Sequence, residues 1–258
     1  MLNDNDLERY ARQVIIPDVG EYGQQKLRDA KVLVIGAGGL GSPVIMYLAA
    51  AGVGSITVID DDDVSLSDLN RQIAFTTSTI GEEKVKQIAR TANAINPDIH
   101  VSGLPVRATT GNASKLIMAH HVIIDCSDNV ETRYLLGDLS HQARVPLVFG
   151  SAVQSEGQVS VFQSNIDNHR GSACYRCVFP SSPGIKQAPG CSQAGILGPM
   201  TGIIGSMQAM ETIKLITGIG TSLTGRLMLV DGRDMSFMEI ATNRRDDCLC
   251  CGTKGPGG

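Results

Sequence analysis

Residues 32–41 of the chain read VLVIGAGGLG, an apolar run that breaks into the pattern Gly36-x-Gly38-x-x-Gly41. This pattern is typical of a strand–turn–helix unit that binds nucleotide phosphates. The first glycine permits a tight turn, the second lets the backbone approach phosphate, and the third lets the helix pack closely on the sheet. Gly39 adds another backbone N–H that can face an anion at the helix N-terminus. The glycines therefore predict a phosphate site without saying which nucleotide occupies it.

Short apolar runs alternate with helical patterns through the first half of the chain. The runs lie at 31–36, 55–60, 99–104, 121–126 and 146–150, and the helical patterns lie at 40–51, 81–96, 112–119 and 129–142. This alternation predicts parallel strands in a doubly wound α/β sheet. The second half changes character, with strand-like runs at 157–162, 225–231 and 237–241 and a helical pattern at 200–218. The expected fold is a mixed sheet whose parallel N-terminal half is extended by antiparallel strands.

No linker, repeat or low-complexity block divides the sequence, so we expect one domain over 1–258. Within it we expect an N-terminal helical arm (1–30), a nucleotide-binding half (31–150), a second half (151–252) and a disordered Gly-rich tail (253–258). Residues 164–198 are rich in Pro, Gly, Ser and Cys and show no periodicity. Such a long loop in a compact domain is usually functional or held by other groups.

Charge and hydropathy exclude several classes of partner. The formal charge of −4 gives no electrostatic reason to expect nucleic acid or an anionic membrane. No run approaches the roughly 18 to 20 apolar residues of a membrane span. The N-terminus is acidic and polar, unlike a secretory signal. We therefore expect a cytoplasmic protein.

Asp60 ends the run ITVID at 56–60, close to twenty residues after the glycines. An acidic residue in this place hydrogen-bonds the ribose of a bound dinucleotide, and the pair of features alone suggests a nicotinamide dehydrogenase. Asp60 can also be an ordinary acidic residue at a strand end, since three further aspartates follow it.

Charged residues after successive strands favour a triphosphate instead. Arg71 and Gln72 follow the second strand, Lys84 lies in the first turn of the next helix, and Asp128 and Asn129 follow a later strand. Two cations and a carboxylate at the carboxyl edge of a sheet suit ATP with Mg²⁺. Taken one at a time, each could be a solvated surface charge, and Asp128 could be a helix N-cap.

Four of the seven cysteines form two C-x-x-C pairs, Cys174 with Cys177 and Cys248 with Cys251. Two such turns can supply four thiolates to a tetrahedral, structural Zn²⁺. Redox-active dithiols are the alternative, although neither pair opens a helix after a strand. Cys250 could replace Cys251 only in a tighter chelate.

Candidate nucleophiles and bases outside these motifs are few. Cys191 lies in the long loop just before a helix, where the helix N-terminus would lower its pKa and favour a reactive thiolate. An inert loop cysteine is the alternative. None of the five histidines stands in an obvious catalytic position, so we expect them to be structural or exposed.

From residue 7 to residue 252 the chain resembles the ThiF/MoeB/HesA family of ubiquitin-activating-like adenylyltransferases. The resemblance rests on RYARQ (9–13), GAGGLGSP (36–43), LAAAGVG (48–54), DDDDVSLSDLNRQ (60–72), DCSDNVETR (125–133), CYRC (174–177), GSMQAMETIK (205–214) and the closing C-x-x-C-G.

This resemblance implies a Rossmann-like fold, a homodimer, and ATP-dependent adenylation of the C-terminal Gly-Gly carboxylate of a small ubiquitin-like sulfur carrier protein. The second half would then bind the carrier, and a sulfur-donor protein is left open as a further partner. DDDDV and NDLERYARQ favour the thiamine-pathway members, with the molybdopterin members as the alternative. A dehydrogenase and a non-catalytic nucleotide-binding scaffold are the rival classes.

The resemblance also implies roles for individual residues. Gly39 contacts phosphate, Asp60 holds the ribose, and Asp128 with neighbouring Asn129 binds Mg²⁺. Arg12 reaches the nucleotide of the partner subunit across the dimer. The triphosphate is held by Lys84 and the segment Ser67, Asp68, Leu69, Asn70 and Arg71. The four paired cysteines are the Zn²⁺ ligands, and Cys191 resembles the loop cysteine that can link covalently to the activated carrier.

Asp68 departs from the family pattern, which usually reads Ser-Asn-Leu where this chain has Ser-Asp-Leu. A carboxylate beside phosphates is repulsive unless it points away from them or binds a metal ion.

Overall fold

The computed structural model describes residues 2–169, 171–180 and 194–252, so the expected tail at 253–258 lies outside the described residues. Eight strands form one sheet in the order β3-β2-β1-β4-β5-β6-β7-β8. Neighbours from β3 to β5 are parallel, and neighbours from β5 to β8 are antiparallel. The predicted fold class is therefore confirmed. The strands are β1 (Lys31–Ile35), β2 (Ser55–Ile59), β3 (His100–Leu104), β4 (Val122–Asp125), β5 (Leu147–Val153), β6 (Glu156–Phe162), β7 (Arg226–Asp231) and β8 (Ser236–Ala241).

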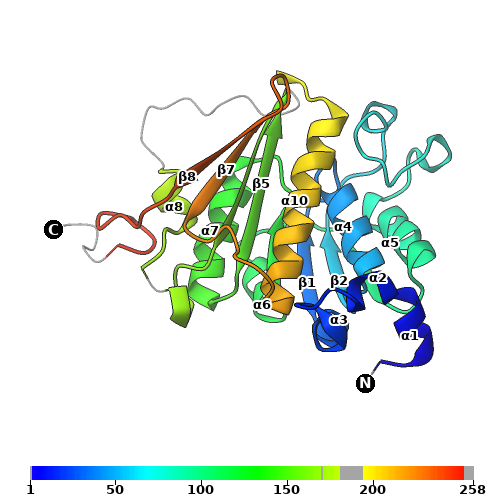
Figure 1. Ribbon diagram of the computed structural model, residues 1–258. Coiled ribbons are helices and arrows are strands. Elements are labelled where there is room, and N and C mark those ends of the chain that lie inside the picture. Colours follow the sequence, from blue (N-terminus) through cyan, green and yellow to red (C-terminus); the bar gives the residue numbers. More distant parts are fainter. Residues whose placement is uncertain (1, 170, 181–193, 253–258) are drawn as a thin grey trace.

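Helices cover both faces of this sheet (Figure 1). One face carries α3, α4, α5 and α10, and the other carries α6, α7 and α8. Within the described ranges, no helix is both long and apolar enough to cross a membrane. The helices are α1 (Asp4–Arg9), α2 (Ala11–Val14), α3 (Gly20–Asp29), α4 (Gly41–Ala51), α5 (Lys84–Ile95), α6 (Ala113–Met118), α7 (Val130–Ala143), α8 (Tyr175–Val178) and α10 (Gly198–Thr217).

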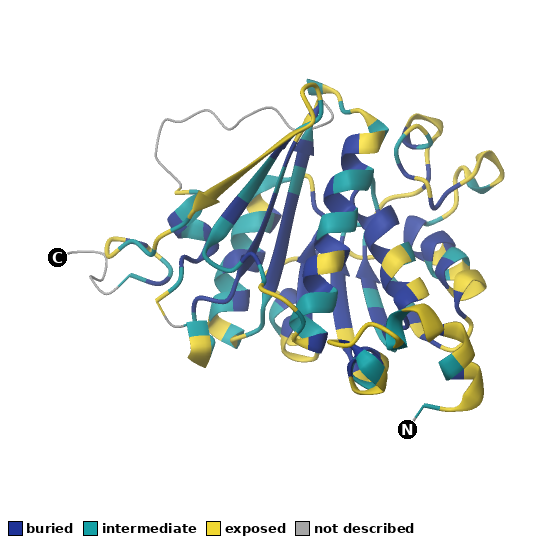
Figure 2. Ribbon diagram, in the orientation of Figure 1, coloured by how far each residue is buried: buried dark blue, intermediate teal, exposed yellow. Residues whose placement is uncertain are grey.

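The alternation of side chains along β1 explains why its sequence is a continuous apolar run. Val32 and Val34 belong to the core that includes residues of α4, α5 and α10, whereas Leu33 and Ile35 belong to the core that includes residues of α6 and α7. A parallel strand covered on both faces needs an apolar side chain at every position. The solvent-exposed edge strand β8 is the opposite case, since all six of its residues are exposed (Figure 2).

The sheet order creates a switch point between β1 and β4. The chain runs from β1 through α4 to β2 on one side, and β4 lies on the other side of β1. The carboxyl ends of β1 and β4 therefore lie side by side, where α/β sheets characteristically hold ligands.

One predicted helix is shorter than the sequence pattern suggests. The pattern at 81–96 predicts a helix from residue 81, but α5 begins at Lys84. Gly81 has a left-handed φ of +86°, and Glu83 forms a β-bridge with Asp63 before the helix starts. The bridge fixes the helix start, so that Lys84 falls in the first turn as expected.

The half-buried His120 joins α6 to β2. Its Nδ1 lies 2.7 Å from the carbonyl oxygen of Leu116, and its Nε2 lies 2.8 Å from Oγ1 of Thr57. A carbonyl only accepts, so Nδ1 carries the proton and Nε2 accepts from the threonine in the neutral ring. Burial lowers the pKa of His120 below its ordinary value.

The lowered pKa of His120 predicts a loss of stability in mild acid. Below pH 6.5 the unfolded chain takes up the proton before the folded chain does, so the free energy of unfolding falls as pH falls through this window. His120→Gln should therefore show a shallower decrease between pH 7 and pH 5 than the unaltered protein, measured by urea unfolding. The exposed His100→Gln is the control, and an equal slope for His120→Gln and the unaltered protein would contradict the prediction.

Candidate functional site

A cavity of about 370 Å³ opens at the carboxyl ends of β1, β2 and β4. It is lined by most of the residues that the sequence predicts for nucleotide binding: Gly36, Gly38, Gly39, Asp60, Asp68, Arg71, Gln72, Lys84, Asp128 and Asn129. Gly41 is the first residue of α4. Ser67, Leu69 and Asn70 are next to Asp68 and Arg71 in the sequence but do not line the cavity. The structure thus brings the predicted nucleotide residues to one place.

The glycine turn leaves no room for a side chain at Gly36, at Gly39 or at Gly41, the first residue of α4. Gly36 has a φ of +101°, and a Cβ there would lie 2.6 Å from the carbonyl oxygen of Cys126. A Cβ at Gly39 would lie 2.9 Å from Cγ2 of Thr201 on α10. The turn therefore presents bare backbone to the cavity, as a phosphate-binding turn requires.

Asp60 holds this turn in place from the end of β2. Its carboxylate accepts hydrogen bonds from the backbone N–H groups of Ala37, at 2.7 Å, and Asp62, at 2.9 Å. Burial raises the pKa of Asp60, and these two backbone donors oppose the rise. Asp60 thus both fixes the turn and contributes a carboxylate to the cavity wall.

Lys84 is a buried cation held by carboxylates. Its Nζ lies 2.8 Å from Oδ2 of Asp62 and 3.7 Å from Oδ2 of Asp68. Burial alone would lower the pKa of Lys84, but the hydrogen bond to Asp62 and the nearby charges of Asp60 and Asp68 raise it above its ordinary value. The lysine is therefore a fixed positive charge at the cavity.

Asp68 points toward the cations and local donors. It accepts from the backbone N–H of Ser65 at 3.0 Å and from Nε2 of Gln72 at 2.9 Å, and it lies 3.3 Å from Nη2 of Arg71. Arg71 also donates through Nη1 to the carbonyl oxygen of Ser67, at 2.7 Å. The departure from the family pattern thus places a buried carboxylate against Arg71 and Lys84, the side chains predicted to bind phosphate.

Asp128 and Asn129 have different surroundings. Asn129 caps α7 by accepting from the backbone N–H of Thr132, at 2.9 Å. The alternative that Asp128 is the N-cap is therefore wrong. Asp128 is exposed at the cavity, and among the described residues it has no hydrogen-bond or ion-pair partner. Its carboxylate is available to a metal ion, and carboxylate oxygens are ligands that Mg²⁺ prefers.

Three further cavity residues were not singled out from the sequence: Arg107, Arg133 and Thr201. Arg107 follows the carboxyl end of β3, and that position in a parallel sheet was a usable signal. Arg133 lies one turn into α7 and donates to the carbonyl oxygen of Ser127, at 3.0 Å. Thr201 had no local signal, because only the packing of α10 brings it to the glycine turn.

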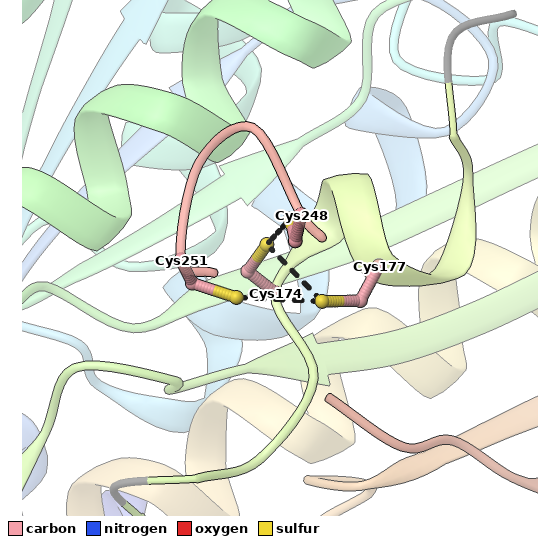
Figure 3. Close-up of side chains that lie close together, drawn as sticks. All are labelled: Cys174, Cys177, Cys248 and Cys251. Atoms are coloured by element: carbon pink, nitrogen blue, oxygen red, sulfur yellow. Dashed lines mark hydrogen bonds between the residues drawn. The ribbon is translucent and has the colours of Figure 1, made fainter. Parts of the chain in front are cut away.

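The paired cysteines converge from two distant segments (Figure 3). Cys174 and Cys177 belong to the start of α8, and Cys248 and Cys251 belong to the C-terminal loop. All four are buried, and their sulfur atoms lie within 4.8 Å of one another. The Sγ separations are 3.8 Å for Cys174 to Cys177, 3.5 Å for Cys174 to Cys248 and 3.3 Å for Cys177 to Cys251.

These distances match a metal tetrahedron better than disulfides. Four sulfurs about 2.3 Å from a central Zn²⁺ are about 3.8 Å apart, whereas a disulfide needs about 2.05 Å. The described cysteines are free thiols. The cluster takes Cys251 and leaves Cys250 at its margin, half-buried, as the sequence interpretation preferred. Cys191 lies outside the described residues.

Arg12 does not line the cavity at the glycine turn. It lies on α2 and lines a second groove of about 410 Å³ formed with α4 and α10. The groove floor is largely apolar, and Tyr47 and Met210 beside it are exposed. The structure therefore separates Arg12 from Arg71, Lys84 and Asp128, the predicted catalytic residues that line the first cavity.

Known proteins resemble the chain over nearly its whole length. A "Sulfur carrier protein adenylyltransferase" of Thermus thermophilus is 42% identical over 247 residues, which are 96% of this chain and 91% of that protein. "Adenylyltransferase and sulfurtransferase MOCS3" of Culex quinquefasciatus is 44% identical over 251 residues, which are 97% of this chain and only 56% of that protein. The chain thus spans little more than half the length of the MOCS3 proteins.

Solved structures show the same fold. The crystal structure of E. coli MccB with MccA-N7isoASN has a TM-score of 0.83 at 20% identity and covers 97% of this chain and 76% of that one. E. coli MccB with ATP has a TM-score of 0.77, also at 20% identity, and covers 97% of this chain and 75% of that one. The profile of the ThiF family matches residues 10–250. Because this match includes the glycine turn, the cavity and three of the four paired cysteines, the chain belongs to the ThiF family.

Proposed function

We propose that this ThiF-family enzyme uses ATP to adenylate the C-terminal carboxylate of a small ubiquitin-like sulfur carrier protein that ends in Gly-Gly. The observation that carries the proposal is the cavity itself, where a bare glycine turn, two fixed cations and an unpartnered carboxylate meet. The names of the Thermus and Culex relatives support a sulfur carrier as the acceptor.

Each cavity residue has a role in this reaction. Gly39 and its neighbours offer backbone N–H groups to phosphate, and Asp60 receives the ribose hydroxyls. Arg71 offers a planar fork and Lys84 a point charge to the triphosphate oxygens. Both cations already stand at the cavity wall, so charge stabilisation needs little rearrangement.

The chemistry is an in-line displacement at the α-phosphorus. A carboxylate oxygen of the carrier forms the new P–O bond, and the bond from the α-phosphorus to the bridging oxygen breaks. Pyrophosphate leaves with that electron pair, and the product is an acyl-adenylate. The nucleophile is already ionised at neutral pH, so no protein base is required. Mg²⁺, held by Asp128, would neutralise charge on the phosphate oxygens.

The assignment of the carrier's pathway rests on sequence motifs alone. The acidic run at residues 60–63 favours thiamine thiazole biosynthesis, and molybdopterin synthesis, which the resemblance also allows, is the alternative. We also propose one domain with a carrier-binding second half, and a cytoplasmic location. A dehydrogenase is the less favoured class, because the cavity combines Arg71, Lys84 and Asp128, for which hydride transfer has no use.

Asp128→Ala should lower carrier-dependent ATP–pyrophosphate exchange by roughly 100-fold or more, because it removes the carboxylate proposed to hold Mg²⁺. The exchange is measured with thiamine-type and molybdopterin-type carriers separately, so the active carrier also identifies the pathway. Asp29→Ala is the matched control, since Asp29 is an exposed carboxylate on α3 at the opposite edge of the sheet. Near-normal exchange by Asp128→Ala, or no exchange with any carrier together with micromolar NAD binding, would refute the assignment.

We further propose that Cys174, Cys177, Cys248 and Cys251 hold one structural Zn²⁺. The protein purified without chelator should contain one zinc per chain by elemental analysis. Cys251→Ser should lose most of the metal and melt at a lower temperature, because the ion joins two distant segments. Cys250→Ser, which makes the same substitution one position away, should keep the zinc content and the melting temperature of the unaltered protein. Protein that contains no zinc would contradict this proposal.

We also propose a homodimer in which Arg12 acts on the partner's nucleotide. The exposed apolar residues Tyr47 and Met210 beside the Arg12 groove support an interface on this face. Arg12→Ala and Asp128→Ala should each be nearly inactive alone. A mixture of the two should regain part of the activity, because one hybrid site then holds both unaltered groups. If mass spectrometry shows the mixed dimer and no activity returns, Arg12 does not act across the interface.

A further inference from the structure

The cavity carries more negative than positive side chains. Among the described residues that line it, five are carboxylates and four are cations: Asp60, Asp61, Asp62, Asp68 and Asp128, and Arg71, Lys84, Arg107 and Arg133. A site for a polyphosphate anion would be expected to carry a positive excess. This negative excess means that at least one of the carboxylates opposes the binding of a polyphosphate.

Asp68 contacts both cations that we assign to the phosphates. Its Oδ1 lies 3.3 Å from Nη2 of Arg71, and its Oδ2 lies 3.7 Å from Nζ of Lys84. The side chains of Asp68 and Lys84 are only 9% and 6% exposed, so water screens this pair poorly. Asp68 thus cancels part of the positive charge offered to a ligand.

Asp68 is also fixed where it is. Its Oδ2 accepts from both the backbone N–H and the hydroxyl of Ser65, each at 3.0 Å, and its Oδ1 accepts from Nε2 of Gln72 at 2.9 Å. Asp62 differs, because its side chain is 67% exposed and can turn into solvent when a phosphate takes its place on Lys84. Asp62 can therefore move away from Lys84 when a ligand binds, whereas Asp68 remains beside Lys84 and Arg71.

We propose that Asp68 makes the cavity select the Mg²⁺-bound nucleotide and reject the metal-free one. This inference rests on the proposed nucleotide function. ATP alone carries about four negative charges and its Mg²⁺ complex about two, and a fixed carboxylate repels them in proportion to that charge. The penalty from Asp68, as a free energy, is therefore about twice as large for metal-free ATP.

Asp68→Asn tests this charge role directly. The amide keeps an oxygen that can accept a hydrogen bond, and it removes one negative charge. ATP binding without any carrier is measured by calorimetry, once in EDTA and once in excess Mg²⁺. Relative to the unaltered protein, we expect the Kd of Asp68→Asn for ATP to fall about tenfold in EDTA and about threefold in Mg²⁺. The variant would then prefer the Mg²⁺ complex over metal-free ATP less strongly than the unaltered protein does. Asp29→Asn makes the same change of charge at the opposite edge of the sheet and should alter neither value.

The outcomes separate the alternatives. An equal change in EDTA and in Mg²⁺, or weaker binding in both, would mean that Asp68 only supports the local structure, and would overturn the proposal. If no nucleotide binds to the unaltered protein at all, the proposed function itself fails.

A measurement on the unaltered protein covers the case in which Asp68→Asn does not fold. In EDTA, ATP should bind no more tightly than AMP, because Asp68 repels the added phosphates and offsets part of the positive charge of Arg71 and Lys84. In Mg²⁺, ATP should bind more tightly than AMP. Metal-free ATP that binds tenfold more tightly than AMP would overturn the proposal.

Discussion

The architecture of the site depends on one close approach, that of Gly36 to the carbonyl oxygen of Cys126. Any side chain at Gly36 would collide with this carbonyl, so the ends of β1 and β4 can lie side by side only with glycine there. The same junction receives α10, because Gln208 donates to the carbonyl oxygen of Asp125 at 2.8 Å. That contact helps to place Thr201 against Gly39 at the floor of the cavity. Backbone crowding, more than side-chain chemistry, thus gives the cavity its shape.

Electrostatics within this frame follow from burial. A buried ammonium is costly unless carboxylates surround it, and Lys84 meets this condition through Asp62 and Asp68. The carboxylates must in turn be fixed by donors, which Ser65 and Gln72 supply to Asp68. The cations are therefore held in place before any ligand arrives, and the ligand must compete with acids that belong to the protein.

The sequence was sufficient for the parts of the structure that local patterns determine. Glycine spacing predicted the turn at Gly36, and residues after parallel strands, such as Lys84 and Asp128, were expected at the carboxyl edge. It was insufficient where distant elements meet. Thr201 reaches the cavity only through the packing of α10, and the contacts of Asp68 with Arg71 and Lys84 depend on how a short 3₁₀ turn (Leu66–Asp68) lies against α5. The sequence also could not decide whether Asp128 or Asn129 caps α7, because that depends on the hydrogen bond that Asn129 accepts from the backbone N–H of Thr132.

The cysteine cluster has a consequence for the entropy of folding. Cys174 and Cys248 are 74 residues apart in sequence, so bringing them together closes a long loop. The entropy lost in that closure corresponds to about 4 kcal/mol for an otherwise unstructured chain. Much of this cost is already met once β6, β7 and β8 have paired, because the strands carry the C-terminal segment back toward α8. The parallel half closes a comparable loop where β1 pairs with β4, because Val32 and its partner Val122 are 90 residues apart. Once β6, β7 and β8 have paired, joining the four cysteines costs little further chain entropy.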